Sequence, residues 1–399
     1  MKKLPLLAAV LAVALSLSAC GENSAKNAET DIVAADTSEK TSETTTAKPE
    51  ETTVSEEKTT AEMTETEPVI EFVEPAAEDF EYQYDTVING IKITAYTGED
   101  EAVRIPSELD GELVKKVSIG AGYYNKNATM KYIELPDGIT SLDLSNCPML
   151  EKVTVPEGVT ELKMDACERI ESIVIPESVT LIGNGAFNFC LNLKSVTLPS
   201  GLKKIDDWAF QSCEMLESIN IPDDVTEIGE MAFGACNNLA SINIPASVEK
   251  IGEGAFTCLN LTNVTFSEGT ALKTLNGFRR CEDLESIIIP NGVEEIGHEA
   301  FLECKSLKNV TMPESVKIIN TSAFKSCKEL KEIIIPDGVE RIEMAAFSNC
   351  TGLRSMSLPN SIKYISNDAF ENCDGLTITY NGNEYNHTNL NDLCNTING

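Results

Sequence analysis

The fold of this chain is decided by a 21-residue stretch, residues 216–236, which reads LESINIPDDVTEIGEMAFGAC. The preceding stretch, residues 193–213, reads LKSVTLPSGLKKIDDWAFQSC, and the following one, residues 239–258, reads LASINIPASVEKIGEGAFTC. Each opens on leucine, carries an apolar residue and a proline near its middle, and closes on Ala-Phe and cysteine. A pattern that recurs in register at a fixed period is typical of a solenoid.

Cysteine marks this period along most of the chain. Eleven of the 13 cysteines follow one another at steps of 20, 22 or 23 residues: Cys147, Cys167, Cys190, Cys213, Cys236, Cys258, Cys281, Cys304, Cys327, Cys350 and Cys373. Stacked equivalents would be close enough for disulfides, but the number is odd. Each ladder cysteine falls at the same step of the apolar pattern, and no Cys-x-x-Cys cluster occurs. We therefore expect buried, reduced thiols that serve as core residues.

Each repeat has two halves with different periodicity. Residues 196–198 alternate apolar and polar side chains, which favours a short strand with one buried face. Pro199 ends that strand, since proline cannot donate to a strand ladder. The second half spaces its apolar residues three or four apart, which favours a short α-helical or 3₁₀ turn. One such unit cannot bury its own apolar face, so the units are expected to stack with parallel strands about 4.8 Å apart.

The consensus L-x-x-I-x-I-P-x-x-V-x-x-I-G-x-x-A-F-x-x-C resembles the BspA-like type of leucine-rich repeat. The resemblance covers about residues 100–380. It implies a repeat solenoid with one short parallel strand and one short helical or 3₁₀ turn in each repeat of about 23 residues. It also implies a bacterial surface protein that binds host matrix proteins or other cells.

The start of the chain resembles an export signal. Residues 1–19 carry two lysines and then a largely apolar run, and they end on small residues, as a signal peptide does. Cys20 follows directly, which resembles a bacterial lipobox and implies lipidation of Cys20. The alternative is an ordinary signal peptide with a cysteine after its cleavage site.

The composition changes abruptly after Cys20. Residues 21–80 are rich in Thr, Glu and Ser and hold 17 acidic and 4 basic residues. Such a segment buries too little apolar surface to offset the entropy of ordering. We therefore expect residues 20–80 to be a lipidated, disordered tether that holds the folded part at the extracellular face of the cell membrane.

The remaining sequence divides into a solenoid and two caps. Residues 81–135 contain Asn89-Gly90 between apolar runs, a hairpin signal, and are expected to form an N-terminal cap and a first irregular repeat. Residues 136–375 are the leucine-rich repeat solenoid. Residues 376–399 are expected to form a C-terminal cap, with a hairpin around Asn381-Gly382 and a short helix over 388–397.

Composition and motifs argue against several functions. The two histidines lie at unrelated repeat positions, and no catalytic, metal-binding or cofactor-binding motif occurs, so we expect no enzyme and no cofactor. The net charge is −33 for the chain and −22 for residues 81–399, which disfavours nucleic acid as a partner. A monomer with neutral or basic partners is expected, and contact with the membrane only through the lipid.

The outward strand positions form two columns of mostly small hydroxyl or amide side chains, and solenoids usually bind along such a face. Trp208, the single tryptophan, stands where other repeats have Gly185, Met231 or Gly254, so it is either an exposed anchor or packed on its neighbour. The candidate binding residues are Trp208, Ser195, Thr197, Ser218, Asn220, Ser241, Asn243, Asn263 and Thr265.

Three functions fit these observations. The first is a surface-anchored protein that mediates adhesion or another protein–protein interaction. The second is an envelope scaffold without a dedicated ligand, which the absence of Trp, Tyr and Arg from the two columns favours. The third is a glycan-binding module, which would call for rows of exposed aromatic residues.

Overall fold

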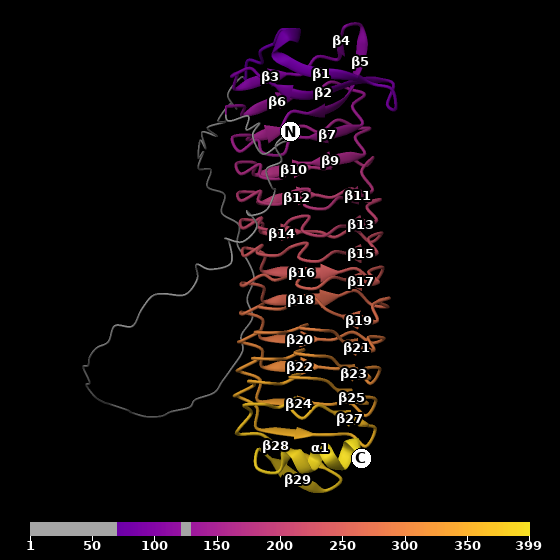
Figure 1. Ribbon diagram of the computed structural model, residues 1–399, viewed down its shortest axis with the longest axis vertical. Helices are drawn as coiled ribbons and strands as arrows, with labels where there is room; N and C mark the ends of the chain where they lie inside the picture. Colours follow the sequence, from indigo (N-terminus) through magenta and orange to yellow (C-terminus); the bar gives the residue numbers. More distant parts are fainter. Residues whose placement is uncertain (1–69, 121–128) are drawn as a thin grey trace, which may run out of the picture. The chain divides into compact units, whose positions relative to one another are not determined.

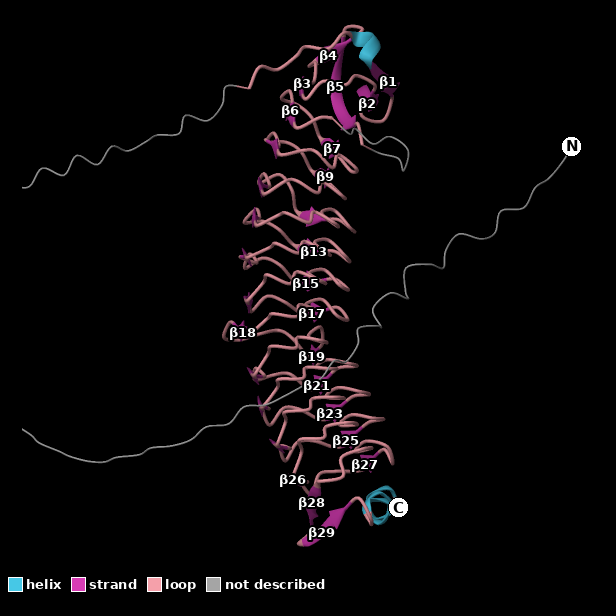
Figure 2. Ribbon diagram, turned by 90° about the vertical axis from the view of Figure 1, so that its left-hand side faces the viewer, coloured by secondary structure: helices cyan, strands magenta, loops and turns pink. Residues whose placement is uncertain are grey.

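The computed structural model of the chain describes residues 70–120 and 129–399. The expected signal peptide, Cys20 and most of the expected tether lie outside these residues. The described part is a column of stacked coils closed by a sheet at one end and by a hairpin and helix at the other, which Figures 1 and 2 show from two sides. The expected repeat solenoid with hairpin caps is confirmed.

One series of parallel strands begins shortly after the leucine that opens most repeats. Its members are β3 Ala102–Arg104, β6 Tyr132–Glu134, β8 Lys152–Val153, β10 Ser172–Val174, β12 Ser195–Thr197, β14 Ser218–Ile219, β16 Ser241–Ile244, β18 Asn263–Phe266, β20 Ser286–Ile288, β22 Asn309–Thr311, β24 Glu332–Ile334, β26 Ser355–Ser357 and β28 Thr377–Tyr380. The register places equivalent residues opposite one another, as in Ser195↔Ser218. In the three-residue strands of this series, the middle residue packs toward the core and its two neighbours point outward.

A second series of parallel strands runs along another side of the coils. Its members are β2 Gly90–Tyr96, β5 Glu112–Ser118, β7 Ser141–Asp143, β9 Glu161–Lys163, β11 Leu181–Ile182, β13 Lys204–Ile205, β15 Glu227–Ile228, β17 Lys250–Ile251, β19 Thr274–Leu275, β21 Glu295–Ile296, β23 Ile318–Ile319, β25 Arg341–Ile342 and β27 Tyr364–Ile365. From β7 onward each places one apolar residue in the core, whereas the longer β2 and β5 place several there. Figure 1 shows the two series as parallel columns of labels.

The second half of the repeat differs from the expected α-helical or 3₁₀ turn. It consists of the second strand and a run of tight turns. Trp208 and Ser212 have φ values of 55° and 58°, in the left-handed region, and so prevent continuous helix. Alternate backbone N–H groups of the turns bond to the next coil, as when Phe210 N donates to Ala232 O at 2.7 Å. The N–H groups between them bond within the turn, as when Gln211 N donates to Trp208 O at 3.1 Å. Pairing between coils therefore takes the place of about half of the pairing that a helix would supply.

The caps use the remaining elements. At the N-terminal end, η1 Ala77–Asp79 leads into β1 Phe80–Asp85, which pairs antiparallel with β2, and β4 Glu108–Leu109 pairs antiparallel with β5. At the C-terminal end, β29 Asn383–Asn386 pairs antiparallel with β28, and α1 Leu390–Asn398 buries Leu393 and Cys394. The hairpins at Asn89-Gly90 and Asn381-Gly382 and the C-terminal helix are thus confirmed.

The folded part begins before residue 80, where we expected the tether to end. Val73 N bonds to Ala102 O at 3.0 Å, and Arg104 N bonds to Val73 O at 2.9 Å. Glu74 pairs with Arg104 at 2.7 Å, and Phe80 is buried. Val73 and Phe80 supply apolar surface that the preceding Thr- and Glu-rich sequence lacks, so this segment adds to the first coil.

A stack of phenylalanine rings fills the core beneath the turns. Successive ring centroids lie 5.2–5.9 Å apart with interplanar angles of 2–11°. The rings belong to Phe187, Phe210, Phe233, Phe256, Phe278, Phe301, Phe324, Phe347 and Phe370. Such pairs are worth about 0.5–1.5 kcal/mol each beyond the burial of their area. The stack holds neighbouring coils in register.

The ladder cysteines lie beside this stack, and their expected burial is confirmed. From Cys213 onward, each thiol donates to the carbonyl oxygen of the phenylalanine one coil earlier, at 3.0–3.2 Å. Cys190 and Cys167 bond in the same way to Met164 O and Leu144 O. The thiols therefore serve as packing groups and as hydrogen-bond donors between coils.

Candidate binding faces of the solenoid

The eight strand-face candidates lie together on one side of the solenoid. All eight side chains are exposed: Ser195, Thr197, Ser218, Asn220, Ser241, Asn243, Asn263 and Thr265. Strand register brings the residues of β16 and β18 directly opposite one another. The strand ladder is interrupted between β14 and β16, so the eight residues belong to two adjoining sheets.

Two of these residues form a polar cluster with a third that the sequence did not single out. Thr265 Oγ1 donates to Asn243 Oδ1 at 2.9 Å, and Asn243 Nδ2 donates to Ser267 Oγ at 3.3 Å. Ser267 stands where most repeats have proline. The cluster therefore joins the regular strand face to an irregular repeat.

That irregular repeat produces a groove between β18 and β20. Nine residue steps separate Phe266 from Leu275, against seven between Ile221 and Ile228. The two extra residues form a wider loop, and the strand ladder is interrupted between β18 and β20. The groove has a volume of about 640 Å³ and is lined by residues 263–269, 286–288, 290 and 291, so it includes the candidates Asn263 and Thr265.

Exposed aliphatic side chains on the same face were not among the candidates. Ile288 is 71% exposed and lines the groove, and Ile334 is 82% exposed two strands farther along. Thr311 lies between them in the same outward column. The signal was present in the sequence, because isoleucine stands twice in a column of hydroxyl and amide side chains. Val174, 67% exposed, occupies the same column on β10.

Trp208 lies apart from the strand-face candidates. It follows β13 on the turn side of its coil, and its side chain is 38% exposed. Its left-handed backbone is shared by Gly185, Met231 and Gly254 at the equivalent positions, with φ values of 50–60°. This conformation explains why glycine recurs there. The structure therefore does not unite Trp208 and the strand face in one site.

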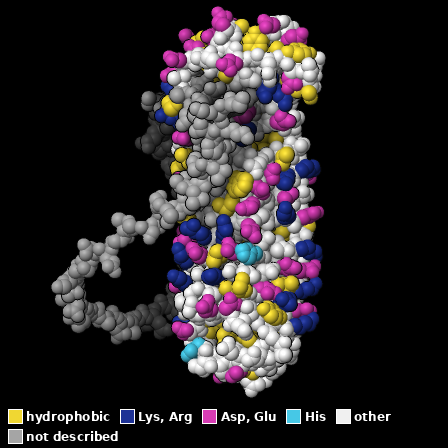
Figure 3. All heavy atoms as spheres, in the orientation of Figure 1, with side chains coloured by type: hydrophobic (Ala, Val, Ile, Leu, Met, Phe, Trp, Pro, Cys, Tyr) yellow, Lys and Arg dark blue, Asp and Glu magenta, His cyan; other side chains and the backbone are white. Residues whose placement is uncertain are grey.

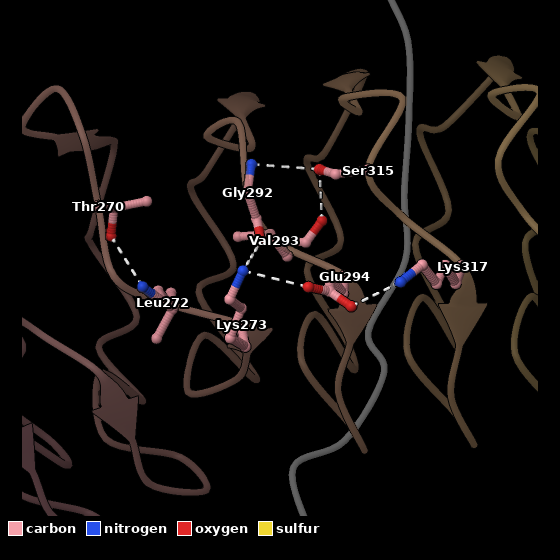
Figure 4. Close-up of polar contacts among 8 residues, drawn as sticks. All are labelled: Thr270, Leu272, Lys273, Gly292, Val293, Glu294, Ser315 and Lys317. Atoms are coloured by element: carbon pink, nitrogen blue, oxygen red, sulfur yellow. Dashed lines mark hydrogen bonds and ion pairs between the residues drawn. The ribbon is translucent and has the colours of Figure 1, made fainter.

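The second strand series carries an alternating ladder of charges. Glu294 lies between Lys273 and Lys317, at 3.1 and 2.7 Å, and the ladder continues through Glu340 and Lys363. Figure 3 shows dark blue and magenta side chains side by side along this edge, and Figure 4 shows Glu294 between its two lysines. Hydrogen bonds from both lysines lower the pKa of Glu294, and Glu294 raises the pKa of Lys317. Opposite charges at the repeat period support the correct stacking register.

A serine beside the charge ladder also links consecutive coils, through hydrogen bonds to the backbone of the preceding coil. In Figure 4, Gly292 N donates to Ser315 Oγ at 3.2 Å, and Ser315 Oγ donates to Val293 O at 2.7 Å. Equivalent serines bond to the preceding coil at Ser178, Ser247 and Ser361. These polar groups pair with one another. We therefore assign this side of the solenoid a role in stability rather than in ligand binding.

The cysteine ladder has no nucleophilic character. Desolvation by burial raises the pKa of the Cys147 and Cys190 thiols to about 12, so thiolate is scarce at neutral pH. Within residues 70–120 and 129–399, no group of three or more His, Cys, Asp or Glu side chains could hold a metal ion. In the same ranges no helix is long and apolar enough to cross a bilayer.

Comparisons with known proteins agree with this architecture. A model of the BspA type leucine rich repeat region (6 copies) matches residues 164–276 and 274–395, which is more than half of the chain. A leucine-rich repeat protein from Bacteroides ovatus is similar in structure, with 24% identity, a TM-score of 0.52 and coverage of 78% of this chain and 93% of its own.

A leucine rich cell surface protein from Faecalibacterium prausnitzii has 23% identity and a TM-score of 0.46, over 76% of this chain and 94% of its own. No curated protein sequence matches the chain. The repeat pattern, the stacked coils and the family match together establish that this chain belongs to the BspA-type leucine-rich repeat family.

Proposed function

We propose that this chain is a cell-surface-anchored leucine-rich repeat protein whose strand face binds a protein partner, as an adhesin does. Family membership supports a binding scaffold rather than an enzyme. The observation that carries the proposal is the exposure of Ile288 in a 640 Å³ groove and of Ile334 two strands farther along, on a strand face of mostly uncharged side chains. Apolar surface rimmed by polar groups is typical of interaction sites on soluble proteins, and Phe266 and Ile288 supply such surface in the groove.

The groove also suggests the character of the partner surface. Its hydroxyl and amide groups can donate and accept hydrogen bonds, and Ile288 offers one apolar contact. Glu268 is its one charged residue. A neutral or weakly basic protein surface with an apolar projection complements this lining.

The test compares binding by the full chain and by two variants. The panel of probes is immobilised host matrix proteins, whole cells and polysaccharides. We expect saturable binding to protein, weakened roughly tenfold or more in Ile288→Thr/Ile334→Thr, which is the effect of losing an apolar contact of about 1.4 kcal/mol. Threonine already occupies this column at Thr197, Thr265 and Thr311, so the fold tolerates it.

Val174→Thr is the matched control, because Val174 occupies the same column on β10, away from the groove. It should bind as the unmodified chain does. No binding to any protein probe at tens of micromolar would contradict the proposal and favour a scaffold. Binding to polysaccharide alone would favour the glycan-binding alternative.

The anchor is a separate part of the proposal. It rests on the apolar run before Cys20 and on the lipobox resemblance of the residues around it. Cys20→Ala should release the protein from the membrane fraction into the medium. Retention of Cys20→Ala on the membrane would contradict lipidation at Cys20.

A further inference from the structure

The turn side of several coils donates three backbone N–H groups to the next coil, whereas the coils of Phe256 and Phe278 donate one and two. In the coil of Trp208, the donors are Trp208, Phe210 and Ser212, and they bond to Glu230 O, Ala232 O and Gly234 O at 2.7–2.8 Å. The donors are every second residue of one segment, and the acceptors are every second residue of the equivalent segment in the next coil. The same set recurs with Glu299, Phe301 and Glu303, which bond to Thr321 O, Ala323 O and Lys325 O at 2.8–3.1 Å.

The last coil has these donors, and among the described residues no further coil stacks on it. The equivalent N–H groups belong to Asp368, Phe370 and Asn372, and within the described residues none of them has a hydrogen-bond partner. Every earlier phenylalanine of the stack, from Phe187 to Phe347, donates its N–H to the next coil. The series therefore ends at an unpaired edge, which is a template for pairing with another chain.

The C-terminal cap covers the other two sides of this coil. On the first strand series, β29 pairs with β28. On the second, Asn398 closes β27: Asn398 Nδ2 donates to Ile365 O at 2.9 Å, and Ile365 N donates to Asn398 Oδ1 at 3.0 Å. Only the turn side, among the three sides described, lacks such a closure.

A pocket of about 370 Å³ lies at this uncovered edge. The three donor residues line it, together with the apolar Leu376, Ile378 and Leu390. Its lining includes the carboxylates of Asp368, Glu371 and Asp374 and contains no lysine or arginine. Glu371 and Asp374 are exposed. The edge thus combines hydrogen-bond donors with negative charge.

We propose that this edge binds a basic peptide segment of a partner protein, which adopts the turn conformation of a further coil and continues the turn-side ladder. Its alternate carbonyl oxygens accept from the N–H groups of Asp368, Phe370 and Asn372, and its lysine or arginine pairs with Glu371 or Asp374. Peptides are known to bind by adding their backbone hydrogen-bonding groups to an open edge of a protein. The carboxylates disfavour an anion, although anions also accept hydrogen bonds. The site is separate from the strand-face groove and does not depend on it.

The probe for this site comes from the chain itself. Residues 318–326, IINTSAFKS, already supply the carbonyl oxygens of Thr321, Ala323 and Lys325 to a coil of the same kind, and carry one lysine and no acid. A synthetic peptide of this sequence is added to the full chain. The readouts are its dissociation constant and the hydrogen–deuterium exchange of residues 367–374.

We expect the peptide to slow exchange within residues 367–374 and to bind more weakly as salt is added. Glu371→Lys should weaken binding roughly five- to tenfold, since an attractive surface pair becomes repulsive. Glu329→Lys is the matched control, because it makes the same charge change at an exposed position of an inner coil. A peptide with glutamate in place of lysine should bind less tightly.

If residues 367–374 exchange at the same rate with and without the peptide, the proposal is overturned, whether or not the peptide binds elsewhere. Equal affinity of Glu371→Lys and Glu329→Lys would overturn it as well. Exchange of residues 345–350, whose N–H groups are already paired, verifies that the variants remain folded. Ile288→Thr/Ile334→Thr should bind the peptide normally, so failure of the strand-face proposal leaves this test intact.

Discussion

The Sγ atom of Cys236 lies 3.2 Å from the backbone carbonyl oxygen of Phe210, one coil earlier, and donates a hydrogen bond to it. The same oxygen accepts the N–H of Cys213 at 3.2 Å. The thiol therefore satisfies a second lone pair of a buried carbonyl group, which is costly to leave unpaired. Repetition of this contact explains why a cysteine, rather than alanine, suits the position.

Replacement of Cys236 by alanine should destabilise the solenoid. We expect the free energy of unfolding to fall by about 1–3 kcal/mol, because both packing volume and the thiol hydrogen bond are lost. Cys147→Ala is the matched control: Cys147 is equally buried, but its thiol has no acceptor among the described residues. Urea denaturation should show a loss smaller by about 1 kcal/mol in the control. Equal losses would refute a role for the hydrogen bond.

The thiols also predict alkaline sensitivity. Burial raises the pKa of Cys190 from its ordinary value of 9.0 to about 12, so between these values only the unfolded chain releases the proton. Stability is therefore present below pH 9 and is lost as pH rises toward 12, by about 1.4 kcal/mol per pH unit for each such thiol. The urea concentration at the unfolding midpoint should fall steeply as the pH is raised from 8 to 11. A flat profile would contradict the burial of the ladder.

The charge ladder predicts a salt-dependent effect at Glu294. In Glu294→Lys, three lysines would follow one another at positions 273, 294 and 317, so the melting temperature should drop at low salt and recover as salt screens the repulsion. Glu294→Gln is the control, since it removes the attraction without adding repulsion. Identical melting curves for the two variants at low salt would show that the ladder has no role in register.

Trp208 predicts an unusual ranking of substitutions. Its φ of 55° is strained for a residue with a Cβ atom, by roughly 1–2 kcal/mol. Trp208→Gly should therefore be more stable than Trp208→Ala in urea denaturation, although glycine usually destabilises regular structure. The reverse order would mean that flexibility of the unfolded chain outweighs the backbone strain.

Much of the fold followed from periodicity alone. The step of the cysteines predicted the stacking register, and alternation around Val196 predicted which side chains face outward. The turn chemistry of Asn89-Gly90 and Asn381-Gly382 predicted both hairpins. The second strand series was missed because two-residue strands such as β13 carry no period of their own, and apolar spacing of three to four residues also fits helix.

The candidate sites were predicted less well, for a physical reason. Exposure of the strand columns follows from local alternation, but the groove beside Ile288 needs two neighbouring coils, one of them widened by its loop. Likewise, the left-handed backbone at Trp208 is imposed by hydrogen bonds to the next coil. None of these relationships is encoded within one repeat.

The sequence by itself determined the repeat, its length, the inward and outward positions and the caps, because these depend on local periodicity and turn chemistry. Only the tertiary structure decided where a groove opens between β18 and β20 and which N–H groups have no partner among the described residues, namely those of Asp368, Phe370 and Asn372. A hydrogen-bond donor is free or satisfied according to what the neighbouring coil offers it, and that neighbour is distant in sequence.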